Sequence, residues 1–391
     1  MKEIKPKVLL KLDRMPFYVG ILNPNQKPKL PAVMPFYLYV DERLAIPRLV
    51  RTRVIEKTLE LAYSLGSMLS TPLGESPLSN ERMAETIAVL REKSGGTFEG
   101  KRYVEVGAGN GALLNAIREY GAEVIGFEIG PQAEEARRRF DLTMVQGELA
   151  PKHLPSKVDC IFSYGCLEHI YEPHEFIDVA RELLVPGGLF FHRVPNSMLL
   201  FKTGDIEGLC HEHVNYFTPE NAVRLLAARG FVNCGAEPTK AGNELNIWGY
   251  ANPDAMLSWP GDILSELTSE SELLHNFSKI VEKKVSHQVE RIRSRVLRLK
   301  GGKLGFYAGG HILASLADVS QHSRFFDGDE TKWGKCWLHG LPPIEPPSNL
   351  RSDSVDVVIV CREHYFVPIH TYLRETVRLS EAIKIIPLSD V

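Results

Sequence analysis

A strand that ends in three closely spaced glycines constrains the fold more than any other feature of this sequence. An apolar strand followed by glycines and then by a helical pattern is typical of the first turn of a doubly wound parallel sheet, where the glycines let a ligand approach the backbone. Short apolar runs alternate with helical stretches from residue 101 to about residue 194, which predicts an α/β class domain. The strand and turn read Tyr103-Val104-Glu105-Val106-Gly107-Ala108-Gly109-Asn110-Gly111.

The rest of the chain divides into further segments. At 391 residues the chain is long enough for two or three domains. We predict a mostly helical region over 1–98, the doubly wound Rossmann-like domain over 99–255, a long amphipathic helix over 256–302 and a second, smaller α/β domain over 303–391. The basic run from Lys279 to Lys303 is interpreted as the solvated face of that helix.

Charge and cysteine content exclude several classes of protein. The 46 Lys and Arg residues nearly balance the 49 Asp and Glu residues, and the net charge of -3 gives no general attraction to nucleic acid or to anionic membranes. No run approaches the ~18 apolar residues that a membrane-spanning helix needs. The six cysteines are scattered without a C-x-x-C pair. We therefore expect a cytoplasmic protein with a small-molecule substrate and with neither a nucleic-acid nor a membrane partner.

Acidic residues beside the glycine turn distinguish between two cofactors. A dinucleotide such as NAD also suits the turn, because Gly107, Gly109 and Ala112 fit G-x-G-x-x-G/A. Glu105, however, would repel a pyrophosphate and attract an ammonium group, and Glu128 ends the next strand where it can accept hydrogen bonds from ribose hydroxyls. This set resembles class I S-adenosylmethionine-dependent methyltransferases. The predicted cofactor-binding residues are Glu105, Gly107, Ala108, Gly109, Gly111, Glu128, Gly147, Glu148 and Ser163.

The resemblance extends beyond the cofactor domain to the nucleotide-sugar C-methyltransferase family. The segment from Cys210 to Thr218 is similar to the family's E-H-x-x-Y-F-[ST] sequence, and His169 matches a second family histidine. Asp327 to Gly334 is similar to its D-x-N-x-x-K-x-G sequence, Leu341-Pro342-Pro343-Ile344 to its P-I sequence, and Gly305 to His311 to its glycine-alanine turn. The resemblance implies carbon methylation of a nucleotide-linked ketosugar. The substrate contacts that it implies are His211, Asn215, His311 and Lys332.

The sequence also departs from this family. Its members begin with a cysteine-rich zinc module, whereas residues 1–159 contain no cysteine, so a tetrathiolate site cannot form there. Cys210 replaces a family tyrosine, and His311 replaces a family lysine. These replacements leave open an acceptor other than the family's ketosugar.

The loop from residue 211 to 213 offers a base and a carboxylate after the fifth strand. Histidine titrates near neutral pH and is suited to removing a proton from a carbon next to a carbonyl. We predict His213 as the first base and His169 as the second, Glu212 as an orienting or hydroxyl-binding group, and Tyr216 as a reserve candidate. Two alternatives remain: the histidines only brace neighbouring loops, or Cys210, His211 and His213 bind a metal. No further ligand has recognisable spacing, so no metal is predicted.

Three functions are consistent with these residues. The first is methyl transfer from S-adenosylmethionine to a carbon of a small polar acceptor, and the second is O-methylation of a sugar or another metabolite. The third is a non-catalytic scaffold in which the basic helix engages a partner or RNA. The intact glycines and acidic residues of the cofactor site count against the third.

Overall fold

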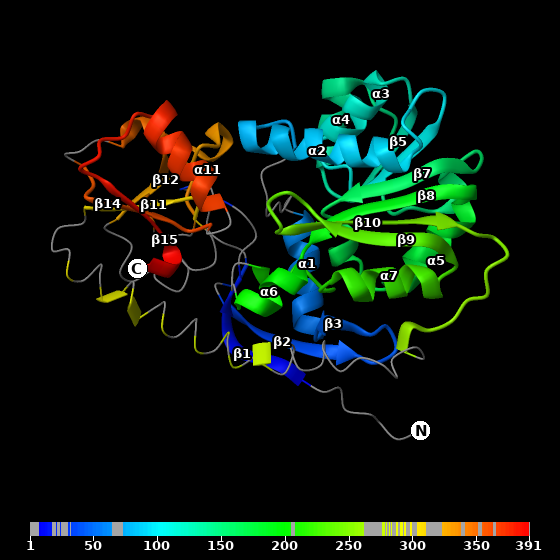
Figure 1. Cartoon of the computed structure of the whole chain (residues 1–391), viewed down its shortest axis with the longest axis horizontal. Helices are drawn as coiled ribbons and strands as arrows, with labels where there is room; N and C mark the ends of the chain where they lie inside the picture. Colours follow the sequence, from blue (N-terminus) through cyan, green and yellow to red (C-terminus); the bar gives the residue numbers. More distant parts are fainter. Residues whose placement is uncertain are drawn as a thin grey trace.

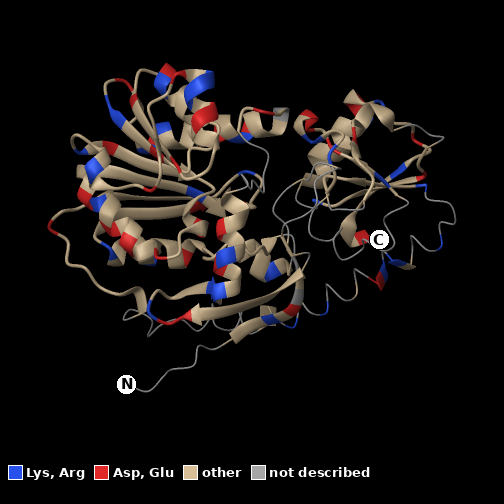
Figure 2. Cartoon of the chain, turned by 180° about the vertical axis from the view of Figure 1, so that it is seen from behind, with Lys and Arg blue, Asp and Glu red and all other residues tan. Residues whose placement is uncertain are grey.

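The chain was analysed as a computed structural model with two α/β units that lie side by side (Figure 1). The structure describes residues 8–17, 33–64, 73–204, 208–261, 303–309, 323–337, 341–350, 354–362 and 365–390, together with single positions between 21 and 31 and between 276 and 298. Among these residues, basic and acidic positions are interspersed over both units (Figure 2). No helix within the described ranges combines the length and apolar character that crossing a membrane requires.

The N-terminal region begins with an antiparallel sheet of order β1-β2-β3, not with helices. The prediction of a mostly helical region is wrong for its first half. In β2 the residues Met34, Phe36 and Leu38 are buried and alternate with more exposed neighbours, which is the period of a strand with one covered face. The helices follow this sheet. The elements are β1 (Val8–Pro16), β2 (Val33–Asp41), β3 (Ile46–Leu49), α1 (Arg53–Ser64) and α2 (Pro77–Lys93).

The seven-stranded sheet of the second segment confirms the predicted doubly wound fold. Its order is β6-β5-β4-β7-β8-β10-β9, with parallel pairing from β6 to β8 and antiparallel pairing at β10 and β9. Consecutive strands run outward from β4 in one direction and from β7 in the other. Ligands of such sheets bind where the strand order reverses, at the carboxyl ends. The strands are β4 (Arg102–Val106), β5 (Glu123–Glu128), β6 (Met144–Gln146), β7 (Val158–Tyr164), β8 (Leu184–Pro195), β9 (Phe231–Pro238) and β10 (Glu244–Ala251).

Helices cover both faces of this sheet (Figure 1). One buried cluster joins the sheet to α5 and α7 and includes Ile177 and Leu225, and the other joins it to α2, α3 and α4 and includes Leu90 and Leu114. Because both faces are covered, most side chains of the central strands β4, β7 and β8 are buried. The helices are α3 (Ala112–Glu119), α4 (Gln132–Phe140), α5 (Pro173–Leu183), α6 (Ser197–Thr203) and α7 (Pro219–Ala228), with 3-10 turns η1 (Pro151–His153) and η2 (Leu167–His169).

The C-terminal unit contains a smaller, fully parallel sheet of order β13-β12-β11-β14-β15. The elements are β11 (Leu304–Tyr307), β12 (Arg324–Phe326), η5 (Glu330–Lys332), β13 (Ile344–Glu345), η6 (Pro347–Asn349), β14 (Val357–Val360), α11 (Phe366–Thr371), the π-helical turn η8 (Tyr372–Thr376), β15 (Lys384–Pro387) and η9 (Leu388–Asp390).

The long amphipathic helix predicted over 256–302 falls mainly outside the described residues. Phe277 and Val281, two of the single positions described there, are helical and fully buried. The Phe277 ring lies 4.9 Å from the ring of Phe201 on α6 and belongs to the apolar cluster of the N-terminal sheet.

Backbone hydrogen bonds attach β3 to the loop that bears the predicted base. The Leu49 amide donates to the Val214 carbonyl at 2.9 Å, and the Tyr216 amide donates to the Pro47 carbonyl at 2.9 Å. Arg48 reinforces the joint, because its buried guanidinium donates to the Asn215 side chain at 3.1 Å. The N-terminal sheet therefore packs against the loop at residues 210–216 and holds it in place.

Candidate functional site

A cleft of about 1310 Å³ opens at the carboxyl ends of β4, β5, β7 and β8. Its walls come from the seven-stranded sheet, from α1 and α2, and from the C-terminal unit, which contributes Tyr307, Asp327 and Lys332 among others. A drug-sized ligand occupies roughly 300–1,000 Å³. The cleft is therefore large enough to hold a cofactor and an acceptor together, at the switch point of the sheet.

The three glycines after β4 have three different roles. All have positive φ, at 69° for Gly107, 51° for Gly109 and 76° for Gly111. A Cβ at Gly109 would have no atom within 4 Å, because this residue faces the open cleft, whereas a Cβ at Gly107 would lie 3.0 Å from Cys166. Gly111 precedes α3 and does not line the cleft. A Cβ at Gly111 would lie 2.8 Å from Ala136 Cβ, so this glycine allows α3 to pack against α4.

Glu128 joins the end of β5 to the glycine turn. Its Oε2 accepts a hydrogen bond from the Gly109 amide at 2.9 Å, and its Oε1 accepts one from the Gly130 amide at 2.7 Å. A carboxylate has about four lone-pair sites, so capacity for ribose hydroxyls remains. The two hydrogen bonds from backbone amides fix this carboxylate at the wall of the cleft.

Glu105 is an acidic group with an incomplete set of partners. Its side chain lies in the cleft wall, the residue is only 2% exposed, and its Oε2 has no hydrogen-bond partner among the described residues. Burial raises the pKa of Glu105 well above its ordinary value, and the nearby charge of Glu128 adds to this effect. A buried, unpartnered carboxyl oxygen is costly, and the ammonium group of S-adenosylmethionine is the partner that it lacks. The residues present therefore fit this cofactor.

The remaining predicted cofactor residues divide into two groups. Ala108, Gly147 and Glu148 line the cleft. Ser163 does not line it, because it is fully buried and its hydroxyl hydrogen-bonds to Nδ1 of His192 inside the sheet. Ser163 lies near the end of β7, but its side chain does not face the cleft, so the predicted cofactor contact by Ser163 is wrong.

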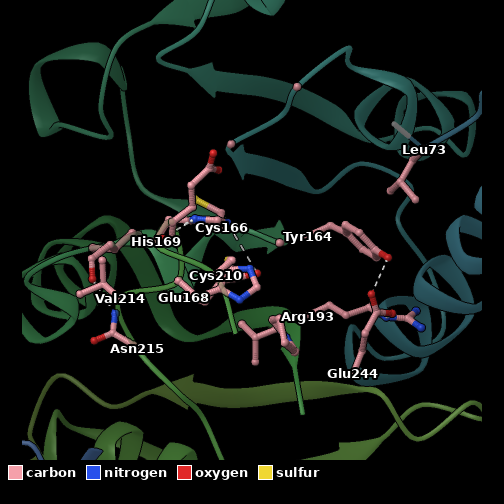
Figure 3. Close-up of a pocket in the computed structure, with 18 of the residues that line it drawn as sticks. Leu73, Tyr164, Cys166, Glu168, His169, Arg193, Cys210, Val214, Asn215 and Glu244 are labelled. Atoms are coloured by element: carbon pink, nitrogen blue, oxygen red, sulfur yellow. Dashed lines mark hydrogen bonds and ion pairs between the residues drawn. The ribbon is translucent and has the colours of Figure 1, made fainter. Parts of the chain in front are cut away.

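The two predicted bases, His169 and His213, meet in the cleft with ring centroids 5.1 Å apart. Nδ1 of His169 lies 2.8 Å from the backbone carbonyl of Glu212. Burial lowers the pKa of His169 to about 4, so the ring is neutral at physiological pH. Figure 3 shows His169 beside Glu168 and Cys166 at this side of the cleft. Burial raises the pKa of Glu168 to about 8.

Tyr63 completes this group and could not be predicted from the sequence. It comes from α1, lines the cleft, and places its hydroxyl 3.3 Å from Nδ1 of His169. The region 1–98 was expected to be mostly helical, but no local signal showed which of its side chains would face the cleft. Only the attachment of the N-terminal sheet to the loop at residues 210–216 brings Tyr63 to His169.

Other predicted residues of this loop have structural partners. His211 is not in the cleft: it is 1% exposed, its Nε2 lies 3.2 Å from the Pro35 carbonyl, and its ring contacts Phe17 and Phe36. The predicted substrate contact by His211 is therefore wrong, because the N-terminal sheet covers it. Tyr216 touches the cleft but is buried, and its hydroxyl donates to the Cys210 carbonyl at 3.3 Å.

Asn215 and Glu212 also line the cleft. The amide group of Asn215 is held on both sides, because its oxygen accepts from Arg48 and its nitrogen donates to the Ile170 carbonyl at 2.6 Å. Glu212 is 3% exposed, and its backbone carbonyl rather than its carboxylate is the group placed against His169. Asn215 is therefore fixed within the loop, and the hydrogen bond between Glu212 and His169 is made by the main chain of Glu212.

The C-terminal unit contributes Lys332, which faces the cleft from η5. Its Nζ lies 3.1 Å from Oδ2 of Asp327 and 3.6 Å from Oδ2 of Asp329. The other substrate residue predicted in this unit, His311, lies outside the described residues.

A buried ionic network at the far side of the cleft was not predicted (Figure 3). Glu244 accepts hydrogen bonds from the Tyr164 hydroxyl at 2.8 Å and from Arg193 Nε at 2.9 Å, and it also pairs with Arg82. Burial favours the neutral form of Glu244, but the two arginines outweigh it and lower its pKa below the ordinary value. Arg193 also forms an ion pair with Glu85, with 2.6 Å between the guanidinium nitrogen and the carboxylate oxygen, and this pair links β8 to α2.

Comparison with known proteins agrees with this geometry. A family model described as a methyltransferase domain matches residues 79–234. The C-methyltransferase NovU of Streptomyces niveus is 25% identical over 306 residues, which cover 73% of this chain and 71% of NovU. The ubiquinone biosynthesis O-methyltransferase of Leptothrix cholodnii is 25% identical over 171 residues, 38% of this chain and 73% of that protein.

Among solved structures, the N-methyltransferase NodS from Bradyrhizobium japonicum WM9 in complex with S-adenosyl-L-homocysteine matches with a TM-score of 0.38 and 16% identity, covering 51% of this chain and 99% of NodS. The sequence matches agree with the cleft, where the glycine turn, Glu105 and Glu128 surround the expected cofactor position. The chain is an S-adenosylmethionine-dependent methyltransferase that resembles the class I methyltransferases and, over most of its length, the C-methyltransferase NovU.

Proposed function

We propose that this methyltransferase adds a methyl group to a carbon of a nucleotide-linked ketosugar, with His213 as the base. The observation that carries the proposal is the His169 and His213 pair, which shares one cleft with the glycine turn and Glu128. The similarity to a C-methyltransferase supports it, because the match spans 73% of the chain and is not confined to the cofactor domain. Glu105, Gly107, Ala108, Gly109, Glu128, Gly147 and Glu148 would hold the cofactor.

The proposed reaction is a direct displacement. When bound, S-adenosylmethionine supplies an electrophilic methyl group, and the protein positions and activates the acceptor. His213 takes a proton from the carbon next to the acceptor's carbonyl. When bound, S-adenosylmethionine would supply the methyl group to that carbon, and the electron pair of the broken carbon–sulfur bond would stay on sulfur, which leaves S-adenosylhomocysteine.

His169 would support this step as a second base or as a proton relay. Its Nδ1 is held by the Glu212 carbonyl, which can only accept, so Nδ1 carries the proton and Nε2 keeps its lone pair. Tyr63 packs edge-on against the same ring, with centroids 6.4 Å apart, and fixes its orientation. The neutral ring that burial produces is the form that can accept a proton.

The C-terminal unit would bind the polar end of the acceptor. Lys332 and Asp327 lie in the wall opposite the sheet, and Trp337 lies close to Lys332, with the Nζ atom 5.2 Å from the ring centroid. A lysine and carboxylates beside an aromatic ring offer contacts for the hydroxyls and phosphates of a nucleotide sugar.

The test combines product analysis with matched variants. Purified protein is incubated with isotope-labelled S-adenosylmethionine and a panel of nucleotide ketosugars, and mass spectrometry with NMR locates the transferred methyl. We expect a methyl on carbon, and we expect His213→Asn to reduce turnover by ~100 to 10,000-fold, the range for general acid-base catalysis, with S-adenosylmethionine affinity nearly unchanged. His169→Asn should reduce turnover less.

His370→Asn is the control, because His370 lies on α11 and does not line the cleft. Melting temperatures show whether each variant is folded. Full turnover in folded His213→Asn would remove this residue from the mechanism.

O-methylation is the second candidate, because ubiquinone biosynthesis O-methyltransferases match 34–42% of the chain. These matches are shorter than the match to NovU, which is why the carbon acceptor is favoured. A methyl found on oxygen in the labelled product would decide for this candidate.

A further inference from the structure

Three metal-ligating side chains come together at the acceptor side of the cleft. Glu168 and His169 belong to η2, and His213 belongs to the loop that β3 supports. One ligand atom from each lies within 4.8 Å of the other two. The residue types along the chain had indicated a different set of candidate metal ligands, Cys210, His211 and His213. The structure turns His211 away from this position, toward the Pro35 carbonyl. Topology, rather than spacing along the chain, brings the new set together.

His169 already has the orientation of a metal ligand. Its Nδ1 lies 2.8 Å from the Glu212 carbonyl, and because a carbonyl only accepts, the lone pair of this ring is on Nε2. Histidines that bind metals through one nitrogen usually donate the other N–H to a carbonyl or a carboxylate in this way. Nε2 lies 3.8 Å from Oε1 of Glu168. The lone pair is therefore on the nitrogen nearest the carboxyl group.

Glu168 supplies an independent indication of a cation. Its side chain is 3% exposed, and its Oε2 has no hydrogen-bond partner among the described residues. Burial of such an oxygen without a partner is costly. Both oxygens lie near the cleft wall, where a bound cation would satisfy the carboxyl group and still be reached by a ligand from the cleft.

We propose that Glu168, His169 and His213 form a binding site for a divalent transition-metal ion such as Zn²⁺. Two imidazoles and one carboxylate with an open position are a known ligand set of zinc. Zinc ligands at about 2.0–2.2 Å in a tetrahedron lie about 3.4 Å apart. The 3.8 Å pair must close by a few tenths of an ångström, and side-chain rotation can bring in the third ligand.

The ion and the proposed base compete for the same lone pairs. While the ion is bound, His213 and His169 cannot accept a proton from an acceptor, so occupancy would block histidine-dependent carbon methylation. The metal site goes beyond the proposed function and does not depend on it, because it needs only the three side chains and not the identity of the acceptor.

Cobalt binding tests the site without any acceptor. The full-length protein is freed of metal with a chelator and titrated with Co²⁺, and the visible absorption of the bound ion and isothermal calorimetry report its stoichiometry and environment. We expect one equivalent in an imidazole-containing site of low coordination number, displaced by one equivalent of Zn²⁺. Glu168→Gln and His213→Asn should each weaken Co²⁺ binding by at least about tenfold, and His370→Asn should not.

Folding is controlled by the melting temperature and by S-adenosylmethionine affinity, both measured without metal. His213 is less buried than Glu168, so His213→Asn tests the site if Glu168→Gln fails to fold. Absence of saturable Co²⁺ and Zn²⁺ binding, or unchanged binding in the two folded variants, would overturn the proposal. Methylation of a ketosugar without ion binding contradicts only the metal site, whereas ion binding without methylation of any ketosugar contradicts only the proposed function.

Discussion

Glu105 couples cofactor binding to a proton. Burial and the nearby Glu128 raise the pKa of the Glu105 carboxyl group well above the ordinary value. At a pH between the ordinary pKa and the raised pKa, the free protein therefore holds a proton on Glu105 that an exposed glutamate would have lost. The ammonium of S-adenosylmethionine favours the carboxylate. We therefore expect binding to release a proton, and affinity to rise with pH across this window.

Calorimetry in two buffers of different ionisation enthalpy measures this proton. Glu105→Gln should abolish its release, while Glu123→Gln, at the exposed start of the neighbouring strand, should leave it intact. Proton uptake by the unaltered protein would contradict the assignment of Glu105 to the ammonium.

Glu128 should contribute directly to cofactor affinity. Glu128→Ala removes a charged acceptor for the ribose hydroxyls and releases the Gly109 amide that it holds at 2.9 Å. We expect a loss of ~1.5–3 kcal/mol in binding free energy, as for hydrogen bonds to charged groups. Glu123→Ala lies on the same strand at its opposite, exposed end and is the matched control. Equal affinities of the two variants for S-adenosylmethionine would rule out this role.

At the level of single residues, the sequence predicted the groups that follow strands and not the groups that depend on distant packing. The glycines, Glu105 and Glu128 follow from a local strand-turn-helix pattern, and the structure places all but Gly111 of these in the cleft wall. Tyr63 and the Glu244 network could not be predicted, because they depend on contacts between distant segments: Tyr63 and His169 are 106 residues apart, and Arg82 and Glu244 are 162 apart. The predicted substrate contact by His211 was wrong for the same reason, since the N-terminal sheet covers this residue.

Among the elements, the glycine turn and α3 provide a sharp test of packing. Gly111→Ala combines a positive φ of 76° with a Cβ that would lie 2.8 Å from Ala136 Cβ and 2.7 Å from a methyl of Leu142. Gly100→Ala has a similar φ of 69° but no atom within 4 Å of the added Cβ. We expect a loss of stability of about 1–2 kcal/mol from φ strain in both, and a further ~1–3 kcal/mol from crowding in Gly111→Ala.

Urea unfolding monitored by circular dichroism measures the difference between the two variants. If both lose the same stability, α3 and α4 are not packed as closely as the structure shows, and Gly111 would be retained for another reason.

The elements that were predicted correctly are those with strong periodicity. The strands and helices of the cofactor domain alternate in chain order and are buried on both sides, so each has a clear apolar pattern. The N-terminal strands were missed because their signal is weaker: β2 alternates correctly but carries Pro35 inside it, and β3 is only four residues long. Proline inside a run argues against a strand unless it lies at an edge or an irregularity.

On the scale of the whole molecule, the C-terminal unit should affect the acceptor and not the cofactor. Lys332→Ala removes a cation from the wall of the cleft, whereas Lys335→Ala changes a lysine three residues further along the chain that does not line the cleft. We expect Lys332→Ala to raise KM for a nucleotide-sugar acceptor by about tenfold, the loss of one hydrogen bond to a charged group, with S-adenosylmethionine affinity unchanged.

Asp327 and Asp329 lose their shared partner in Lys332→Ala, so the melting temperature is measured alongside the kinetics. An unchanged KM in folded Lys332→Ala, or a parallel loss of cofactor affinity, would contradict a role in acceptor binding.

The attachment of β3 to the loop at residues 210–216 determines when during translation the enzyme can become active. Leu49 leaves the ribosome about 165 residues before Val214, its backbone partner, which at a synthesis rate of about 5–20 residues per second is a delay of roughly 8–33 s. During that time Phe36 and the other apolar residues of the N-terminal sheet lack the covering surface that His211 and Tyr216 later provide. A nascent chain therefore exposes this apolar face during the interval, and a fragment that ends before Tyr216 lacks part of the loop to which β3 is hydrogen-bonded.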